Sequence, residues 1–441
     1  MHAADKDRAS DLVLKITGGK PLAGDICVSG SKNAALPEMA AALLTEEPVH
    51  LKNVPRVTDT HVMAQVLASI GAKCEGEGEV TIDAGGASTP TVPDDLGKRM
   101  RATILLLGAL IGRFGSARLP RPGGDDIGAR RVEQHLRGLR QMGATIEESA
   151  TELVAHVDRL RGARIVFDLP TVTGTENILL AAVRAEGRTE IFNAAREPHV
   201  QDLCHLLGKM GARIEGIGTE RLVVDGVPEL GGAEHTVVPD YLEAGTYAIA
   251  AVAASGELRL ECSRPEDLNI VLLKLEQAGA RVEVGEGWFR IGRRQGSKIL
   301  PTDMSTWPFP GFPTDLQAQY MALMTQADGE TVISEYVHEN RFQHVNQLAK
   351  MGASISVEGR LHAFVHGPSR LKATELAVPD IRSGAALVIA ALCAEGESVL
   401  HNAWHVARGY EDMTGKLTAV GARIESIEAE ADPSLGNRTY E

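Results

Sequence analysis

Four short segments combine charged side chains with glycine, proline or hydroxyl groups, and each could bind or activate an anion. They are Gly30–Asn33, Lys98–Arg101, Arg121–Arg131 and Phe309–Asp315. A small anion needs cationic side chains and free backbone N–H groups, and such N–H groups gather where helices begin. Proton transfer also needs a carboxylate held at a fixed position. The four segments therefore indicate anion binding together with acid–base chemistry.

Simpler interpretations of these segments stay open at this stage. Ser31 is a good N-cap residue, and Lys32 beside it would then be solvated. The segment Arg121–Arg131 has three glycines, one proline and five charged residues, a composition that also suits a mobile surface loop. Asp315 is first of all a good N-cap, although the prolines and phenylalanines before it would hold it rigidly, as a catalytic base requires.

The elements that position these segments belong to a unit repeated six times. The pattern Leu-x-x-x-Gly-Ala recurs at intervals of 68–73 residues and predicts a helix, a glycine cap and a strand. Its glycines are Gly71, Gly143, Gly211, Gly279, Gly352 and Gly421. A second helix, rich in alanine and apolar nearly all round, accompanies each copy and should be buried. These helices begin near Ser31, Lys98, Thr173, Asp240, Thr314 and Asp380. Three units before about residue 239 and three after it predict two similar globular domains.

Composition is that of an ordinary soluble enzyme, which we expect to be cytoplasmic. The 441 residues contain no apolar run long enough for a membrane span, and the net charge of −14 disfavours nucleic acid as a partner. The five cysteines are scattered and form no Cys-x-x-Cys pair, which predicts reduced, mostly buried thiols without a disulfide framework or structural zinc. We expect residues 1–11 and 431–441 to be flexible tails and the protein to be a monomer.

Several motifs, in one order along the chain, resemble the enolpyruvyl transferases, and most closely the members that act on UDP-N-acetylglucosamine. The resemblance covers about residues 14–425. Its motifs are Gly-Ser-Lys-Asn-Ala-Ala-Leu-Pro at 30–37, Pro-Gly-Gly at 122–124, Ile-Gly-Ala-Arg at 127–130, Asn-Ala-Ala-Arg-Glu-Pro at 193–198, Phe-Pro-Thr-Asp-Leu-Gln-Ala-Gln at 312–319, Glu-Asn-Arg-Phe at 339–342 and Arg-Gly-Tyr-Glu at 408–411.

The resemblance implies an α/β fold, an inverted α/β barrel of two domains with three repeats each. Because the chain of that fold crosses twice between domains, residues 32–239 would form the first domain and 12–31 plus 240–430 the second. The implied reaction moves the enolpyruvyl group of phosphoenolpyruvate to the 3-hydroxyl of UDP-N-acetylglucosamine and releases phosphate, as the first committed step of peptidoglycan synthesis. It needs no cofactor and no metal.

The same resemblance assigns roles to individual residues. Those implied in catalysis are Asp125, Asp315 and Lys32, with Asp315 as the base toward the hydroxyl. Phosphoenolpyruvate binding falls to Lys32, Asn33, Arg130 and Arg408. UDP-sugar binding falls to Asn33, Arg101, Arg131, Val132, Glu133, Gln134, Thr171, Val172, Thr173, Thr314, Asp315 and Val337. Supporting roles fall to Asp59, Glu197, Asp240, Arg341, Asp380 and Arg382.

One departure from the family pattern concerns the loop. Most members have cysteine after Pro-Gly-Gly, whereas this chain has Asp125. We hypothesise that Asp125 is the general acid or assists product release, with a pKa raised when the loop closes over the substrates. Fosfomycin alkylates the cysteine of other members, so this chain should resist it.

Quieter departures bear on the acceptor. Arg131–Gln134 replaces a Pro-Val-Asp-Leu stretch that contacts uridine in the family, and Leu169 replaces a common lysine. An enolpyruvyl transferase with another acceptor, whether a nucleoside or, less favoured, shikimate 3-phosphate, therefore stays open. So does a catalytically silent paralogue that binds a UDP-sugar. Retention of Lys32, Arg130 and Asp315 argues against the silent form, and His61, His199 and His344 are given no role.

Overall fold

The repeated glycines end six outer helices, as the sequence pattern predicts. A computed structural model describes residues 11–125, 127–129 and 132–429, so the two tails fall largely outside it. The helices are α2 (Thr58–Ile70), α5 (Glu133–Gln141), α7 (Pro198–Lys209), α9 (Asn269–Gln277), α11 (Val345–Lys350) and α14 (Met413–Ala419). Each glycine has φ between +97° and +106°, a left-handed conformation that turns the chain from helix into strand.

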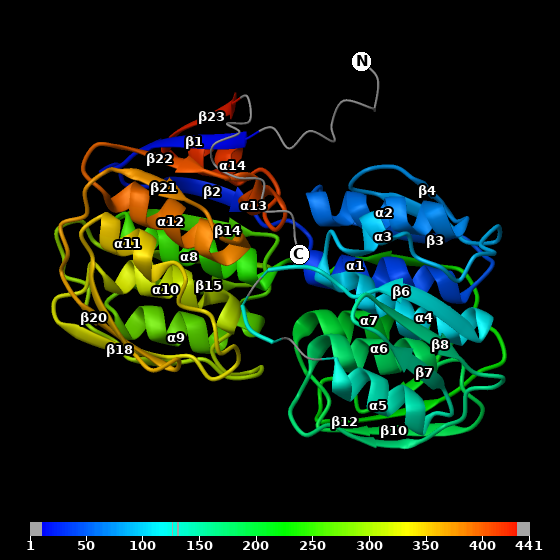
Figure 1. The fold of residues 1–441 in the computed structure, drawn as a ribbon. Coiled ribbons are helices and arrows are strands. Elements are labelled where there is room, and N and C mark those ends of the chain that lie inside the picture. Colours follow the sequence, from blue (N-terminus) through cyan, green and yellow to red (C-terminus); the bar gives the residue numbers. More distant parts are fainter. Residues whose placement is uncertain (1–10, 126, 130–131, 430–441) are drawn as a thin grey trace.

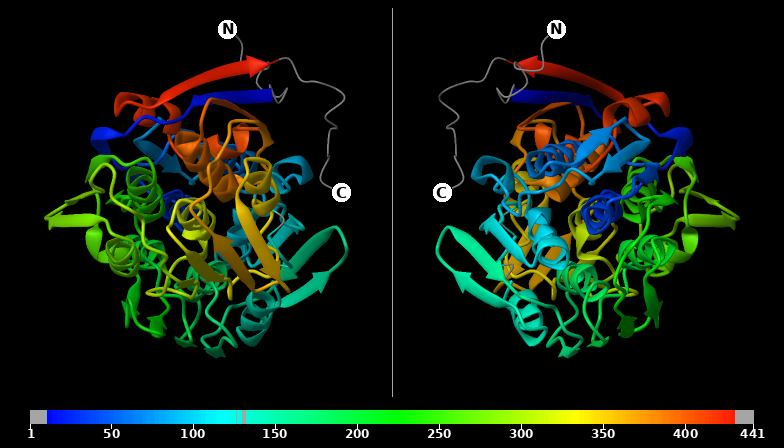
Figure 2. Two further views of the ribbon diagram at one scale, coloured as in Figure 1. Left: turned by 90° about the vertical axis from the view of Figure 1, so that its left-hand side faces the viewer. Right: turned by 90° about the vertical axis from the view of Figure 1, so that its right-hand side faces the viewer.

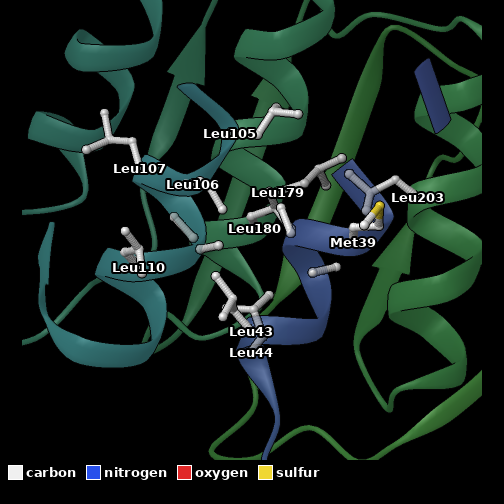
Figure 3. Close-up of a cluster of buried hydrophobic side chains, with 14 of the residues drawn as sticks. Met39, Leu43, Leu44, Leu105, Leu106, Leu107, Leu110, Leu179, Leu180 and Leu203 are labelled. Atoms are coloured by element: carbon white, nitrogen blue, oxygen red, sulfur yellow. The ribbon is translucent and has the colours of Figure 1, made fainter. Parts of the chain in front are cut away.

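Six inner helices form the centres of the units. They are α1 (Lys32–Ala41) with η1 (Ala42–Leu44), η2 (Arg101–Leu105) with α4 (Leu106–Phe114), α6 (Val172–Ala182), α8 (Tyr241–Ala253), η4 (Thr314–Leu316) with α10 (Gln317–Met324), and α12 (Ile381–Cys393). Their starts agree with the predicted ones to within about three residues. Alanine and glycine let these helices approach closely, and leucines fill the remaining space, as Figure 3 shows for α1, α4 and α6.

Small sheets cover the inner helices of the first domain. The orders are β13-β3-β5-β4, β6-β8-β7 and β11-β12-β10-β9. The strands are β3 (Val49–Lys52), β4 (Lys73–Glu75), β5 (Val80–Asp83), β6 (Ser116–Pro120), β7 (Thr145–Glu148), β8 (Glu152–His156), β9 (Arg164–Val166), β10 (Arg188–Phe192), β11 (Arg213–Glu215), β12 (Arg221–Asp225) and β13 (Ala233–Thr236). The short helix α3 (Asp94–Gly97) precedes η2.

Sheets of the second domain have the orders β21-β22-β1-β23, β15-β16-β14-β2 and β17-β18-β20-β19. The strands are β1 (Asp11–Thr17), β2 (Ala23–Cys27), β14 (Glu257–Glu261), β15 (Arg281–Gly285), β16 (Trp288–Gly292), β17 (Met304–Ser305), β18 (Glu330–Ser334), β19 (Ser354–Glu358), β20 (His362–His366), β21 (Glu375–Ala377), β22 (Glu397–His401) and β23 (Arg423–Ala429). The short helices η3 (Pro265–Leu268) and α13 (Trp404–Ala407) also lie here.

Two separate hydrophobic cores make the molecule bilobal (Figure 1). One core draws on residues 34–238, and the other on residues 14–28 and 241–424. The strand β1 lies beside β23, near the opposite end of the chain, in full antiparallel register (Figure 2).

The chain passes between the lobes along two hydrogen-bonded segments. The N–H of Ser31 donates to the carbonyl of Val238 over 2.8 Å, and the N–H of Asp240 donates to the carbonyl of Ser29 over 2.8 Å. These two paired segments are the covalent connection between the lobes. Any other contact between the lobes is non-covalent.

The prediction that all cysteines are reduced and mostly buried is wrong for two of them. Cys27 and Cys262 form a disulfide on the surface, with Cα atoms 5.5 Å apart and 235 residues between them in sequence. Cysteine spacing could not reveal the pair because only the parallel pairing of β2 with β14 brings them together. Among the described residues, no helix has both the length and the apolar character required to cross a bilayer.

Candidate active site

A cavity of about 570 Å³ lies between the lobes, where the inner helices of both domains begin. Its lining includes residues from the first turn of every inner helix, namely Lys32, Arg101, Val172, Tyr241, Asp315 and Ile381. Six helix N-termini therefore face one space. Their partial positive charges favour an anionic ligand, although side chains already cap α6, α8 and α12.

A chain of four charged side chains joins the lobes at one end of the cavity. Lys32 donates to Asp59 over 3.1 Å, and the Nε of Arg408 donates to the other oxygen of Asp59 over 3.1 Å. The Nη1 of Arg408 also donates to Asp125, in the Pro-Gly-Gly loop, over 2.8 Å. Lys32, Asp59 and Arg408 are almost fully buried. Two cations are thus balanced by two carboxylates, one of which belongs to the loop.

The electrostatics of Asp125 are set by the two cations beside it. Burial acts to raise the pKa of this carboxyl, but the positive charges of Arg408 and Lys32 outweigh it and lower the pKa below its ordinary value. Asp125 is therefore ionised in this arrangement, and the raised pKa expected with the loop closed over substrates stays a prediction. It can serve as a proton donor only after these cations are engaged by another anion.

Asp315 lines the cavity from the second lobe and lies between two arginines. The Nη2 of Arg341 donates to one carboxylate oxygen over 2.6 Å, and Arg382 donates to the other through Nη2 at 3.0 Å and Nε at 3.1 Å. Although burial opposes ionisation, these two guanidinium groups hold the pKa of Asp315 far below its usual range. The aspartate is fixed rigidly, as its position after the proline segment predicts, but it is a weak base while both arginines engage it.

Glu335 organises the segment beside Asp315, and the sequence analysis did not identify it. It accepts the hydroxyl hydrogens of Thr306 and Thr314, each over 2.9 Å, and the backbone N–H of Val337 over 2.8 Å. Arg341 donates to the Thr314 hydroxyl over 2.9 Å. Thr314 and Val337 both line the cavity. Glu335 therefore connects two predicted acceptor-binding residues.

Three of the predicted supporting carboxylates act on helix starts or on the contact between lobes. Asp240 and Asp380 cap α8 and α12 by accepting N–H groups of the first turn. Glu197 precedes α7, lines the cavity and accepts the N–H of Phe309 from the other lobe over 3.4 Å. Burial raises the pKa of the Glu197 carboxyl.

Most of the residues predicted to bind the acceptor belong to the first lobe. Those that line the cavity are Asn33, Arg101, Gln134, Thr171, Val172 and Thr173. Gln134 accepts the N–H of Asp168 over 2.7 Å and donates to the carbonyl of Leu169 over 3.2 Å. This pair of bonds fixes the loop that leads into α6, so Gln134 shapes the cavity wall.

Not every predicted residue reaches the cavity. Val132 packs into the first core, and Glu133 begins α5 with its side chain exposed, so neither is among the lining residues. The expectation that both contact the nucleotide is therefore not supported by their placement. Arg130 and Arg131 lie outside the described residues. Arg408 and Asp59 stand behind Asp125 and Lys32 rather than on the cavity surface.

Aromatic residues and a histidine complete the cavity and were missed from the sequence. Trp307 and Phe309 project from the proline segment, and His199 stacks on Tyr241 with ring centroids 6.3 Å apart. Burial lowers the pKa of His199 to about 4, so its imidazole is neutral. Neither ring nitrogen has a hydrogen-bond partner within the described part of the chain. In the sequence, the aromatic residues in and beside the proline segment could have indicated a cavity wall. An isolated histidine such as His199 gives no such indication.

Comparisons with known proteins agree with this arrangement. A family model described as EPSP synthase (3-phosphoshikimate 1-carboxyvinyltransferase) matches residues 16–417. The enolpyruvyl transferase NikO from Streptomyces tendae shares 28% sequence identity, with a TM-score of 0.86 over 95% of this chain and 100% of its own.

EPSP synthase from Acinetobacter baumannii shares the fold at 20% identity. One structure has a TM-score of 0.71 over 95% of this chain and 100% of that chain, and another has 0.70 over 94% and 99%. Since the family model spans most of the sequence, the chain belongs to the enolpyruvyl transferase family, whose reaction moves the enolpyruvyl group of phosphoenolpyruvate to an acceptor.

Proposed function

We propose that the acceptor is UDP-N-acetylglucosamine and that the sugar 3-hydroxyl receives the enolpyruvyl group, as the first committed step of peptidoglycan synthesis. The observation that carries this proposal is the placement of Asp315 in the same cavity as Lys32 and the loop residue Asp125. In this proposal the phosphoenolpyruvate end of the cavity holds Lys32 and Asp125, and Asp315 faces the same space from the other lobe. The nucleotide would lie along the first-lobe lining residues Arg101, Gln134 and Thr171–Thr173.

Phosphoenolpyruvate would bind against Lys32 and Arg408, with Arg130 of the loop as a further cation. Its phosphate and carboxylate would compete with Asp125 and Asp59 for these cations. Once a trianion occupies this end, the positive charges no longer favour ionised Asp125, and the added negative charge raises its pKa. Asp125 can then carry the proton that C3 of the substrate requires.

The reaction has two steps, addition and elimination. In the addition step, one proton leaves the acceptor hydroxyl and another is added to C3. In addition, Asp315 takes the proton of the acceptor hydroxyl, its oxygen bonds to C2 of phosphoenolpyruvate, and Asp125 supplies a proton to C3. In elimination, Asp125 takes a proton back from C3, the bond between C2 and the phosphate oxygen breaks to restore the double bond, and the released phosphate carries away the proton held by Asp315. Asp315 regains base strength if the substrate draws Arg341 or Arg382 away from it.

A second acceptor has a specific observation in its favour. Leu169 is 71% exposed and Trp307 is 61% exposed, and both line the cavity, one from each lobe. This apolar surface stands where the resemblance predicts a lysine near a diphosphate. It favours an acceptor with a planar or apolar group, such as a simpler nucleotide. A silent UDP-sugar-binding protein is disfavoured because Lys32 and Arg408 are present and linked through Asp59, and Asp315 lines the same cavity as Lys32.

The test is phosphate release from phosphoenolpyruvate with three acceptors in parallel: UDP-N-acetylglucosamine, uridine nucleotides without sugar, and shikimate 3-phosphate. Turnover with the UDP-sugar alone supports the proposal, and Asp315→Asn in the same assay controls for contaminating activity. Turnover only with another acceptor would replace the UDP-sugar, and no turnover with any of them would favour a binding protein.

A further inference from the structure

The surface disulfide can be compared with the equivalent position in other repeat units. In three other units, the residue directly after the central strand of the sheet is an asparagine with positive φ: Asn53, Asn193 and Asn402, at +57° to +60°. Asparagine tolerates this left-handed conformation better than most residues. In the unit built on β14, the same position is Cys262, with φ of +55°. Cysteine has no such preference, so its presence there calls for another reason.

The asparagines have a definite task in two of those units. The Nδ2 of Asn53 donates to the carbonyl of Val237 over 2.9 Å, and that of Asn193 donates to the carbonyl of Phe167 over 3.1 Å. Val237 and Phe167 are the first residues beyond the parallel strands β13 and β9. The asparagine therefore ties the end of the neighbouring parallel strand to the sheet.

Cys262 has the equivalent neighbour. The parallel strand beside β14 is β2, Cys27 is its last residue, and Cys27 pairs with Glu261 in the register. The N–H of Val28 donates to the carbonyl of Glu261 over 3.0 Å, just as the N–H of Val237 donates to Lys52 over 2.9 Å. The disulfide joins Cys262 to Cys27, one residue before Val28, the equivalent of Val237. A covalent bond thus ties the same strand end that an asparagine hydrogen bond ties in two other units.

This strand end leads directly into the link between lobes. After Val28, the N–H of Ser29 donates to Glu243 over 3.3 Å, and Lys416 donates to the Ser29 hydroxyl over 2.5 Å. Ser31 then precedes α1, whose first residue is the cavity residue Lys32. The disulfide therefore holds the segment from which an active-site helix starts. Both cysteines are exposed, so a small thiol or disulfide can reach them.

We propose that Cys27 and Cys262 are a reversible thiol–disulfide exchange site, with low-molecular-weight disulfides such as oxidised glutathione as the oxidant. One cysteine thiolate attacks the oxidant and releases a first glutathione thiol. The second cysteine thiolate attacks the mixed disulfide and releases a second. The cysteine pair loses two electrons, and its two protons end on the two glutathione thiols. We call the restraint that the disulfide places on residues 28–31 the clamp. Oxidation forms the clamp. Reduction removes it, because a thiol does not make the hydrogen bond that the asparagine amide makes in other units.

The first experiment equilibrates the native protein in glutathione buffers of increasing oxidised fraction, quenches with N-ethylmaleimide and maps the cysteines by mass spectrometry. We expect peptides containing Cys27 and Cys262 to change together from two alkylated thiols to one disulfide, while Cys74, Cys204 and Cys393 stay unpaired. Two thiols alkylated at every ratio would overturn the proposal. So would a disulfide that the native protein retains in excess reduced glutathione.

A second experiment separates the clamp from a passive surface bond. Hydrogen exchange of the backbone amides of residues 28–31 should be faster in the reduced protein than in the oxidised one, and Tm should fall by about 5 °C on reduction. The matched control is Cys262→Asn, which gives this unit the residue found in three of the other units. Its exchange at residues 28–31 should be slow and unaffected by reductant, whereas Cys27→Ala should exchange as fast as the reduced protein. Equal exchange in all four samples would contradict the clamp.

Discussion

Arg408 of the second lobe donates to Asp125 of the first over 2.8 Å, across 283 positions of sequence, and so joins the loop to the opposite wall of the site. The same guanidinium engages Asp59, so the only charges balancing it among the described ion pairs come from the other lobe. A loop carboxylate thus occupies a cation that the substrate anion requires. Substrate binding and release of this loop contact are therefore expected to be linked.

Asp125→Asn should separate binding from catalysis. Removal of the negative charge leaves Arg408 and Lys32 less neutralised, so phosphoenolpyruvate should bind about tenfold more tightly, a difference of about 1.4 kcal/mol. The amide cannot supply a proton, so kcat should fall by at least about 10²-fold. Equilibrium binding and steady-state kinetics on one preparation measure both. Weaker binding together with unchanged kcat would contradict the role of Asp125.

Fosfomycin should not inactivate the protein in a time-dependent way, because a carboxylate at position 125 replaces the thiol that the drug alkylates. Asp125→Cys should gain such inactivation, provided that the thiol is activated by the nearby positive charges of Arg408 and Lys32. Intact mass after incubation reports the adduct. Asp125→Ser is the matched control, with a similar size and no thiol. An adduct on the unmodified Asp125 chain would disprove the prediction.

Asp315→Asn should abolish turnover while leaving phosphoenolpyruvate bound. The substitution keeps the shape of the side chain but removes the acceptor of the hydroxyl proton, so a loss of about 10²–10⁴-fold in kcat is expected. It also leaves Arg341 and Arg382 without their carboxylate, so some loss of Tm should accompany it. Glu335→Gln serves as the control for local disorder, since Glu335 positions Thr314 without reaching the reacting atoms. Full turnover of Asp315→Asn would remove Asp315 as the base.

The fold could be predicted from the sequence because the same structural unit is repeated six times. The repeat glycines have φ near +100°, which residues with a Cβ rarely adopt. The alanine-rich helices are apolar nearly all round and are buried. Local conformation and overall packing therefore favour the same fold. The candidate anion-binding residues were singled out because positive charge at a buried helix start is costly without a partner. The pairing of Cys27 with Cys262 depends on a contact between segments 235 residues apart, which spacing along the chain cannot reveal. The role of Glu335 depends on how Thr306 and Thr314 fold back onto it within one unit, and no motif marks that contact.

The same limit applies to the electrostatics of Asp125. Its residue type and loop were singled out from the sequence, but the sign of its pKa shift in this arrangement depends on Arg408, which the chain brings to it only through the packing of two lobes. Val132 and Glu133 illustrate the reverse case. They lie in a motif that pointed to the nucleotide, yet α5 starts at that point and turns one side chain into the core and the other to solvent.

His235 should make stability depend on pH on the alkaline side. Burial opposes its charge, but Asp202, at 3.0 Å, and Glu38 raise the pKa of His235 to about 9. Since the unfolded value is about 6.5, this contribution is fully present below pH 6.5 and is lost as pH rises through 9. His235→Gln should therefore lose on the order of 2 kcal/mol at pH 6 and much less at pH 9.5. Urea unfolding at both pH values measures this, and an equal loss at both would contradict it.

The repeated glycines can be tested at Gly211, where space and backbone angle can be separated. A Cβ added at Gly211 meets no atom within 4 Å, yet the residue has φ of +105°. Gly211→Ala should therefore destabilise through backbone conformation alone, by about 1–2 kcal/mol. Gly208, three residues earlier in α7, is equally open but not at positive φ, so Gly208→Ala should be neutral or stabilise by up to about 1 kcal/mol. Thermal unfolding of the two variants decides the matter, since equal shifts of Tm would mean that the left-handed turn is not what the repeat conserves within this chain.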